Sequence, residues 1–71
     1  MPKLYSSDDI IKVLGHRGFI FISHRGSHAK YRKRDGRIIL TVIVPVGRKE
    51  IPYGTFRSIL RQSHLTEEDF E

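Results

Sequence analysis

No cysteine occurs among the 71 residues of this chain, so neither a disulfide framework nor a thiolate zinc site can hold its fold together. A chain of this length has one small apolar core and is expected to bury only about 60% of the surface exposed by its unfolded form. We therefore predict a single domain over residues 1–71, with any site on an open surface instead of a deep cleft. A cysteine nucleophile is also excluded, and a reducing compartment fits best.

A first helix is predicted near the N-terminus. Ser6 and Ser7 are good N-cap residues, and the two aspartates that follow favour the positive end of a helix dipole. Ile10, Val13 and Leu14 then recur at helical spacing and form one apolar face. Gly18 is the expected C′ residue that ends the helix.

Three strands are predicted in the middle of the chain, because short β-branched and aromatic runs alternate there with turn residues. The first is expected to be buried on at least one face. Asp35-Gly36 favours a hairpin turn, and Pro45 lacks the N–H needed to continue a strand. The predicted strands are 19–22, 28–32 and 37–44, joined by turns at 25–27 and 33–36.

A polar loop from Val46 to Gly54 leads to a second predicted helix, capped by Thr55 and carrying Phe56, Ile59 and Leu60 on its apolar face. Residues 66–70 resemble another N-cap and first turn. The element order predicts an α+β, α-β-β-β-α fold, in which two helices cover one face of a three-stranded antiparallel sheet. This is the layout of the double-stranded-RNA-binding domain.

Basic residues are concentrated in the middle of the chain. Thirteen lysines and arginines against eight acids give a net charge of +5. The segment between Ile10 and Thr66, however, contains twelve of the basic residues and only two acids, Asp35 and Glu50, so its net charge is +10. This pattern favours a polyanion such as RNA as the partner, although an ordinary basic surface has some of the same features.

His28 is the strongest candidate for a catalytic residue, because histidine is the usual general base near neutral pH. Gly26 permits a sharp turn before it, and Ser27 adds a hydroxyl. In an extended strand, Lys30 and Arg32 would project from the same face as His28, so phosphate could bind beside a base. From spacing alone, an idle surface histidine is about as good a reading.

The other three histidines are weaker candidates. His16 and His64 fall at predicted helix ends, where an imidazolium meets the negative end of the dipole. His24 ends the first strand near the turn and is a possible helper for His28. None of the four has a recognised zinc spacing with acidic partners, so we expect no metal and no cofactor.

Four segments, in order, are similar to the HicA-type toxins of bacterial toxin–antitoxin pairs. They are Gly18-Phe19, Gly26-Ser27-His28, Val44-Pro45 and the run from Ile51 to Gln62. The resemblance implies a double-stranded-RNA-binding-like fold, metal-independent endoribonuclease activity on mRNA, and inhibition by a HicB-like antitoxin. It makes His28 the catalytic histidine. Gly26, Ser27, Lys30 and Arg32, which the local pattern places beside His28, are the candidates for binding the substrate.

One departure from the family pattern lies in the loop after Pro45. Many members carry a histidine shortly after the Val-Pro pair, whereas this chain has Val46-Gly47-Arg48-Lys49. Arg48 and Lys49 are therefore candidates to replace it in substrate binding. A merely solvated loop is an equal alternative.

A second functional class is a non-catalytic RNA-binding module of the same fold, since both functions need a basic surface. The sequence contains no apolar run of signal-peptide or membrane-spanning length, so we expect a cytoplasmic protein without a membrane partner.

Overall fold

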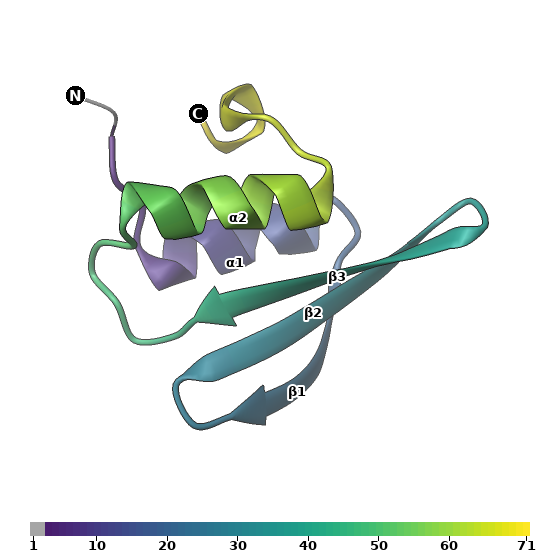
Figure 1. Ribbon diagram of the computed structural model, residues 1–71, viewed down its shortest axis with the longest axis horizontal. Helices are drawn as coiled ribbons and strands as arrows, with labels where there is room; N and C mark the ends of the chain where they lie inside the picture. Colours follow the sequence, from purple (N-terminus) through teal and green to yellow (C-terminus); the bar gives the residue numbers. More distant parts are fainter. Residues whose placement is uncertain (1–2) are drawn as a thin grey trace.

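The computed structural model describes residues 3–71 and has the predicted α-β-β-β-α order (Figure 1). One short 3₁₀ helix follows the second α-helix. The elements are α1 (Ser7–His16), β1 (Ile20–Arg25), β2 (His28–Asp35), β3 (Ile38–Pro45), α2 (Tyr53–Ser63) and η1 (Glu67–Phe70). Across residues 3–71, no helix has the length and apolar character needed to cross a membrane.

The α1 N-terminus is built as predicted. The Ser6 side chain accepts a hydrogen bond from the backbone N–H of Asp9 at 3.0 Å. The Asp9 carboxylate accepts one from the N–H of Ser6 at 3.3 Å, which completes a capping box. Two of the four orphan donors at the helix start are thereby satisfied.

The sheet is an antiparallel meander in the order β1-β2-β3. Arg25 pairs with His28 and Asp35 pairs with Ile38, so each hairpin has a loop of two residues. Gly26 (φ 58°) and Gly36 (φ 64°) stand first in these loops, where a positive φ lets the turn match the strand twist. The second turn is therefore at residues 36–37, and β2 is longer than predicted because it continues to Asp35.

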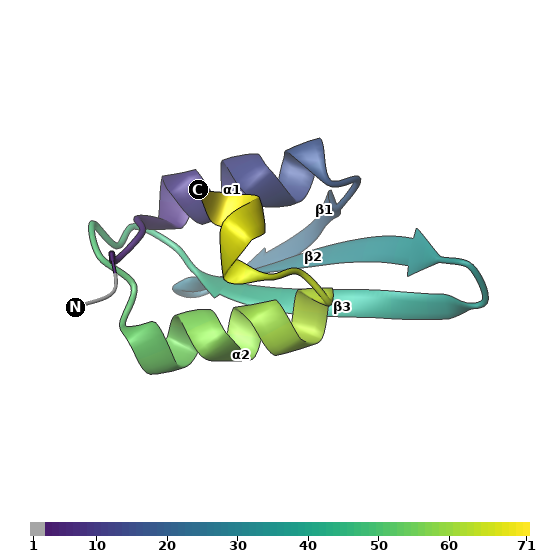
Figure 2. The ribbon, with the colours of Figure 1, turned by 90° about the horizontal axis from the view of Figure 1, so that it is seen from above.

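Both helices lie on one face of the sheet, as Figures 1 and 2 show. They pack against β3, whose Leu40, Val42 and Val44 are buried and point toward them. Ile10, Leu14 and Ile59 supply the apolar helix faces. The loop residue Ile51 is also fully buried, although the segment from 46 to 54 was predicted to be polar.

The predicted burial of the first strand is wrong. Phe19 is buried, but it precedes β1, and every residue of β1 is exposed. The exposed fractions are 64% for Ile20 and 57% for Phe21. The reason is position: the helices cover β3 and β2, and β1 is the sheet edge farther from them (Figure 1).

The predicted N-cap of the second helix is also wrong. Pro52 is the N-cap residue of α2, and its carbonyl accepts the N–H of Phe56 at 3.0 Å. The fixed φ of proline suits this entry into a helix. Thr55 lies inside the first turn instead, so its hydroxyl is available to the surface beside β3.

The C-terminal turn covers the core on the side of the two helices. Residues 66–70 form the predicted capped turn, with a capping box between Thr66 and Asp69. Hydrogen bonding by the backbone N–H of Thr66 lowers the pKa of the Asp69 carboxyl, which also pairs with Arg17 at 3.0 Å. Figure 2 shows η1 between α1 and α2, where Phe70 is buried.

Candidate functional site

The open face of the sheet carries the row of side chains predicted around His28. Ala29 is buried toward the helices, whereas His28 is exposed on the opposite face. Pairing of His28, Lys30 and Arg32 with Pro45, Ile43 and Thr41 puts these three side chains on the helix-free face. The predicted alternation is confirmed.

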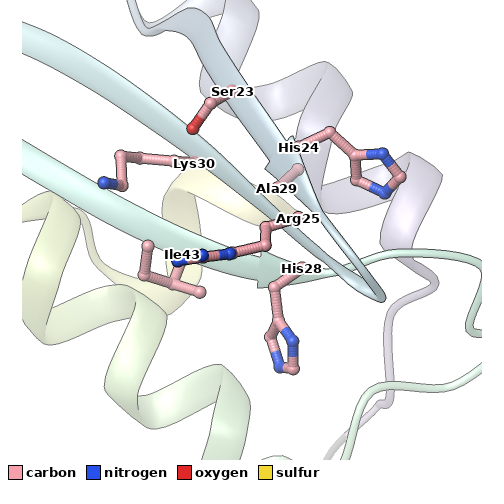
Figure 3. A pocket seen from close by; sticks show the side chains of 7 residues that line it. All are labelled: Ser23, His24, Arg25, His28, Ala29, Lys30 and Ile43. Atoms are coloured by element: carbon pink, nitrogen blue, oxygen red, sulfur yellow. The ribbon is translucent and has the colours of Figure 1, made fainter.

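His28 stands between two shallow hollows and lines both. The first has a cavity volume of about 520 Å³ and is drawn in Figure 3; Ser23, His24, Arg25, His28, Ala29, Lys30 and Ile43 line it. The second, of about 310 Å³, lies between β3 and α2; its lining is His28, Ile43, Pro45, Arg48, Pro52, Thr55, Ser58 and Gln62. His28 and Ile43 are the two residues common to both.

The charge around His28 is positive on both sides. Arg25 and Lys30 line the first hollow, and Arg48 lines the second. Within residues 3–71, no carboxylate lines either hollow, and no group of three His, Asp or Glu side chains could hold a metal ion. The surroundings of His28 therefore favour an anion such as a phosphate diester.

Ser27 contacts the imidazole of His28 directly. Its Oγ lies 3.4 Å from Nδ1, which is at the long end of hydrogen-bonding distance. If Nδ1 carries the proton, it donates to Ser27 and leaves Nε2 free as an acceptor. The contact fits either ring tautomer, since the Ser27 hydroxyl can donate or accept, and the tautomer with the proton on Nδ1 is the one that a general base acting through Nε2 needs.

Arg48 is held near His28 by a buried hydroxyl 41 positions earlier in the chain. Ser7 Oγ donates to the carbonyl of Pro45 at 2.6 Å and accepts from the N–H of Arg48 at 3.0 Å. The backbone N–H of Ser7 also donates to the Arg48 carbonyl at 2.9 Å. The loop after β3 is thus fastened to the start of α1.

Replacing Ser7 with alanine should loosen this loop without opening the core. We expect a loss of about 2–3 kcal/mol in the free energy of unfolding, because both the Arg48 N–H and the Pro45 carbonyl lose a partner. Urea denaturation of the variant measures that loss. Ser6→Ala, which removes an exposed cap bond in the same turn, is the control and should cost about 1 kcal/mol. Equal losses would contradict a special role for Ser7.

Two predicted binding residues lie farther from the hollows. Arg32 shares the face of His28, but its Nε donates to Thr41 Oγ1 at 3.3 Å, and it lines neither hollow. Lys49 is exposed and also lines neither. Of the two loop cations, Arg48 is therefore the one placed beside His28.

Several lining residues were missed by sequence reasoning. Arg25 pairs with His28 across the first hairpin, and its position just before the turn glycine was the available signal. Thr55, Ser58 and Gln62 come from α2, and only the packing of that helix beside β3 brings them to the second hollow.

Of the other histidines, His24 lines the first hollow with His28, whereas His16 and His64 line neither hollow. His24 pairs with Ala29 and so belongs to the opposite face of the sheet; Figure 3 shows its imidazole pointing away from that of His28. His16 ends α1 and His64 is the left-handed C-cap of α2, as predicted for helix ends.

Comparison with known protein families gives one match over most of the chain. A family model described as the HicA toxin of bacterial toxin–antitoxin systems matches residues 7–65, from the first residue of α1 to the segment that precedes η1. A search of curated proteins found no match. The family match confirms the resemblance carried by the ordered sequence segments.

Proposed function

We propose that this chain, which belongs to the HicA family of toxins from bacterial toxin–antitoxin systems, is an endoribonuclease that cleaves mRNA with His28 as its catalytic residue. The observation that carries the proposal is the position of His28 between two cation-lined hollows on the open face of the sheet. A strand of RNA lying across this face would bring a phosphate to the histidine.

The proposed reaction begins with proton transfer to His28. Nε2 accepts the proton of a ribose 2′-hydroxyl, while Nδ1–H donates to Ser27 Oγ. The 2′ oxygen then forms a bond to phosphorus as the bond from phosphorus to the 5′ oxygen breaks. Water at this exposed site supplies the proton that the leaving oxygen takes up, and the imidazolium of His28 returns its proton to the solvent. The products are a 2′,3′-cyclic phosphate and a 5′-hydroxyl.

The cations have the task of stabilising charge on the reacting phosphate. Arg25 and Lys30 approach from one side of His28 and Arg48 from the other. Fixed positive groups stabilise a pentavalent phosphorus state more than the monoanionic diester, because the charge on its oxygens increases. Arg32 and Lys49 would act farther along the RNA backbone, through Coulomb attraction.

The toxin–antitoxin family implies an antitoxin partner. We propose a HicB-like protein that covers the face around His28 and so excludes RNA. An acidic surface on that protein would complement Arg25, Lys30 and Arg48. The exposed apolar edge formed by Ile20 and Phe21 would add contact area beside this face.

The alternative function is an RNA-binding module without chemistry, which the same fold and basic face support. Salt-sensitive RNA binding is expected of both functions, so cleavage is the property that separates them. We expect the purified chain to cut a synthetic mRNA in the presence of EDTA and to leave cyclic phosphate ends. Electrophoresis and mass spectrometry of the products measure this. Bound but intact RNA would support the module instead.

A further inference from the structure

The second hollow contains polar groups that the cleavage chemistry does not use. His28 and Arg48 stand at one side of it, and Thr55, Ser58 and Gln62 project into it from successive turns of α2. Ile43, Pro45 and Pro52 add apolar walls. A half-apolar hollow with a few fixed polar groups is the usual form of a small-ligand site, and about 310 Å³ is at the lower end of the range for such sites.

The orientation of the Gln62 amide is fixed by a backbone donor. β3 is an outer strand of the sheet, and the N–H of Ile43 donates to Gln62 Oε1 at 3.0 Å. An amide nitrogen cannot accept that hydrogen bond, so the oxygen must face Ile43. The NH₂ group of Gln62 is thereby left on the other side of the amide, and within residues 3–71 it has no hydrogen-bond acceptor.

The other polar groups of α2 differ in their availability. Ser58 Oγ donates to the Gly54 carbonyl at 3.4 Å and accepts from Arg61 at 3.2 Å, so it is already engaged. Thr55 has no side-chain hydrogen bond within the described residues. The hollow therefore presents a fixed amide donor from Gln62 and a rotatable hydroxyl from Thr55, which can follow either kind of partner.

We infer that the second hollow binds one nucleobase of the RNA, next to the phosphate at His28, and that Gln62 selects the base through a keto oxygen. The inference rests on the proposed function and names a subsite of it. A planar base would lie against the proline and isoleucine walls while its exocyclic edge meets the Gln62 NH₂ group. Uracil presents a carbonyl where cytosine presents an amino group, so the site distinguishes these two.

A purely structural role for Gln62 is the competing explanation, because its bond to Ile43 covers a free N–H on the sheet edge. Gln62→Glu separates the two roles. A carboxylate oxygen still accepts from the Ile43 N–H, so the edge stays satisfied. The second oxygen, however, accepts where the NH₂ group donated, and it repels a keto oxygen and attracts an amino group.

The experiment measures binding of two uncleavable RNA probes, hexauridylate and hexacytidylate with 2′-fluoro sugars, by fluorescence anisotropy. For Gln62→Glu, the ratio of uridylate to cytidylate affinity should fall about two- to tenfold relative to the unmodified chain, as expected for one hydrogen bond. Arg57→Gln is the matched control. It changes the charge of α2 by the same amount, but Arg57 lines a separate hollow. It should weaken both probes equally.

Three results would overturn the inference: an unchanged affinity ratio for Gln62→Glu, the same ratio change for Arg57→Gln, or no binding of either probe by the unmodified chain. Circular dichroism confirms that each variant is folded. The readout is independent of chemistry, because the probes lack the 2′-hydroxyl. A chain that discriminates between the probes but leaves natural RNA intact would contradict the endoribonuclease proposal and would still support the base subsite.

Discussion

Replacing His28 with alanine is expected to lower the rate of RNA cleavage by about 10²- to 10⁴-fold and to abolish growth arrest when the chain is expressed in bacteria. In the proposed mechanism, His28 removes the 2′-hydroxyl proton. Within residues 3–71, neither hollow is lined by a carboxylate that could take over this task. Single-turnover cleavage of a labelled RNA measures the rate, and mRNA half-lives measure the effect in cells.

RNA binding by the His28→Ala variant should stay close to that of the unmodified chain, because Arg25, Lys30 and Arg48 remain. His24→Ala is the control, since His24 lines the first hollow with His28 but its imidazole points away from that of His28 (Figure 3). It should keep most of the activity. A fully toxic His28→Ala variant would remove His28 from the catalytic role. An equally inactive His24→Ala variant would show that the loss is not specific to His28.

The shallow site has a consequence for the rate of the proposed reaction. His28 is exposed and its contact with Ser27 is long, so water competes for the imidazole and for the phosphate. Cations in high dielectric stabilise developing charge less than those in a closed site. We therefore expect slow turnover from this site, which is compatible with a toxin because mRNA loss accumulates over many cleavage events.

Local sequence rules predicted the parts of the fold that depend on neighbours in the chain. The Ser6 cap, the Gly26 turn and the alternation of His28, Lys30 and Arg32 follow from backbone geometry within a few residues. The family pattern makes His28 the candidate catalytic residue for the same reason, since its Gly-Ser-His turn is a local motif. Strand ends were less accurate, because pairing extended β2 through charged residues to Asp35.

Apart from the N-cap of α2, which was predicted at Thr55 and lies at Pro52, the errors concern contacts between distant segments. An apolar run such as Ile20 to Ile22 indicates a strand, but it does not say whether another layer covers that strand, and here none of the described residues buries it. The position of Arg48 depends on Ser7, and that of Gln62 depends on the edge of β3. The side of the candidate site that α2 forms therefore became visible only in three dimensions.

The largest stability effect is expected at Phe70, which lies outside the segment that matches the family model. Its ring centroid is 5.1 Å from that of Phe56 in an edge-on contact and 5.9 Å from that of Tyr5. The side chain is only 5% exposed, and it joins the C-terminal turn to the segment before α1. Aromatic contacts of this kind add to the free energy gained from burial.

Phe70→Ala should lower the free energy of unfolding by about 3–5 kcal/mol, as usual for a deleted core aromatic. A domain of 71 residues has only about 4–11 kcal/mol in total, so the variant would be close to unfolding at 37 °C. Urea denaturation followed by circular dichroism measures the loss.

Phe21→Ala is the matched control, because the same side chain is removed where it is 57% exposed. Its edge-on contact with Tyr31 is lost, so the expected loss is about 1 kcal/mol. Similar losses in the two variants would mean that η1 does not close the core in solution, whereas a large loss at Phe70 alone would make the C-terminal turn a required part of the fold that supports His28.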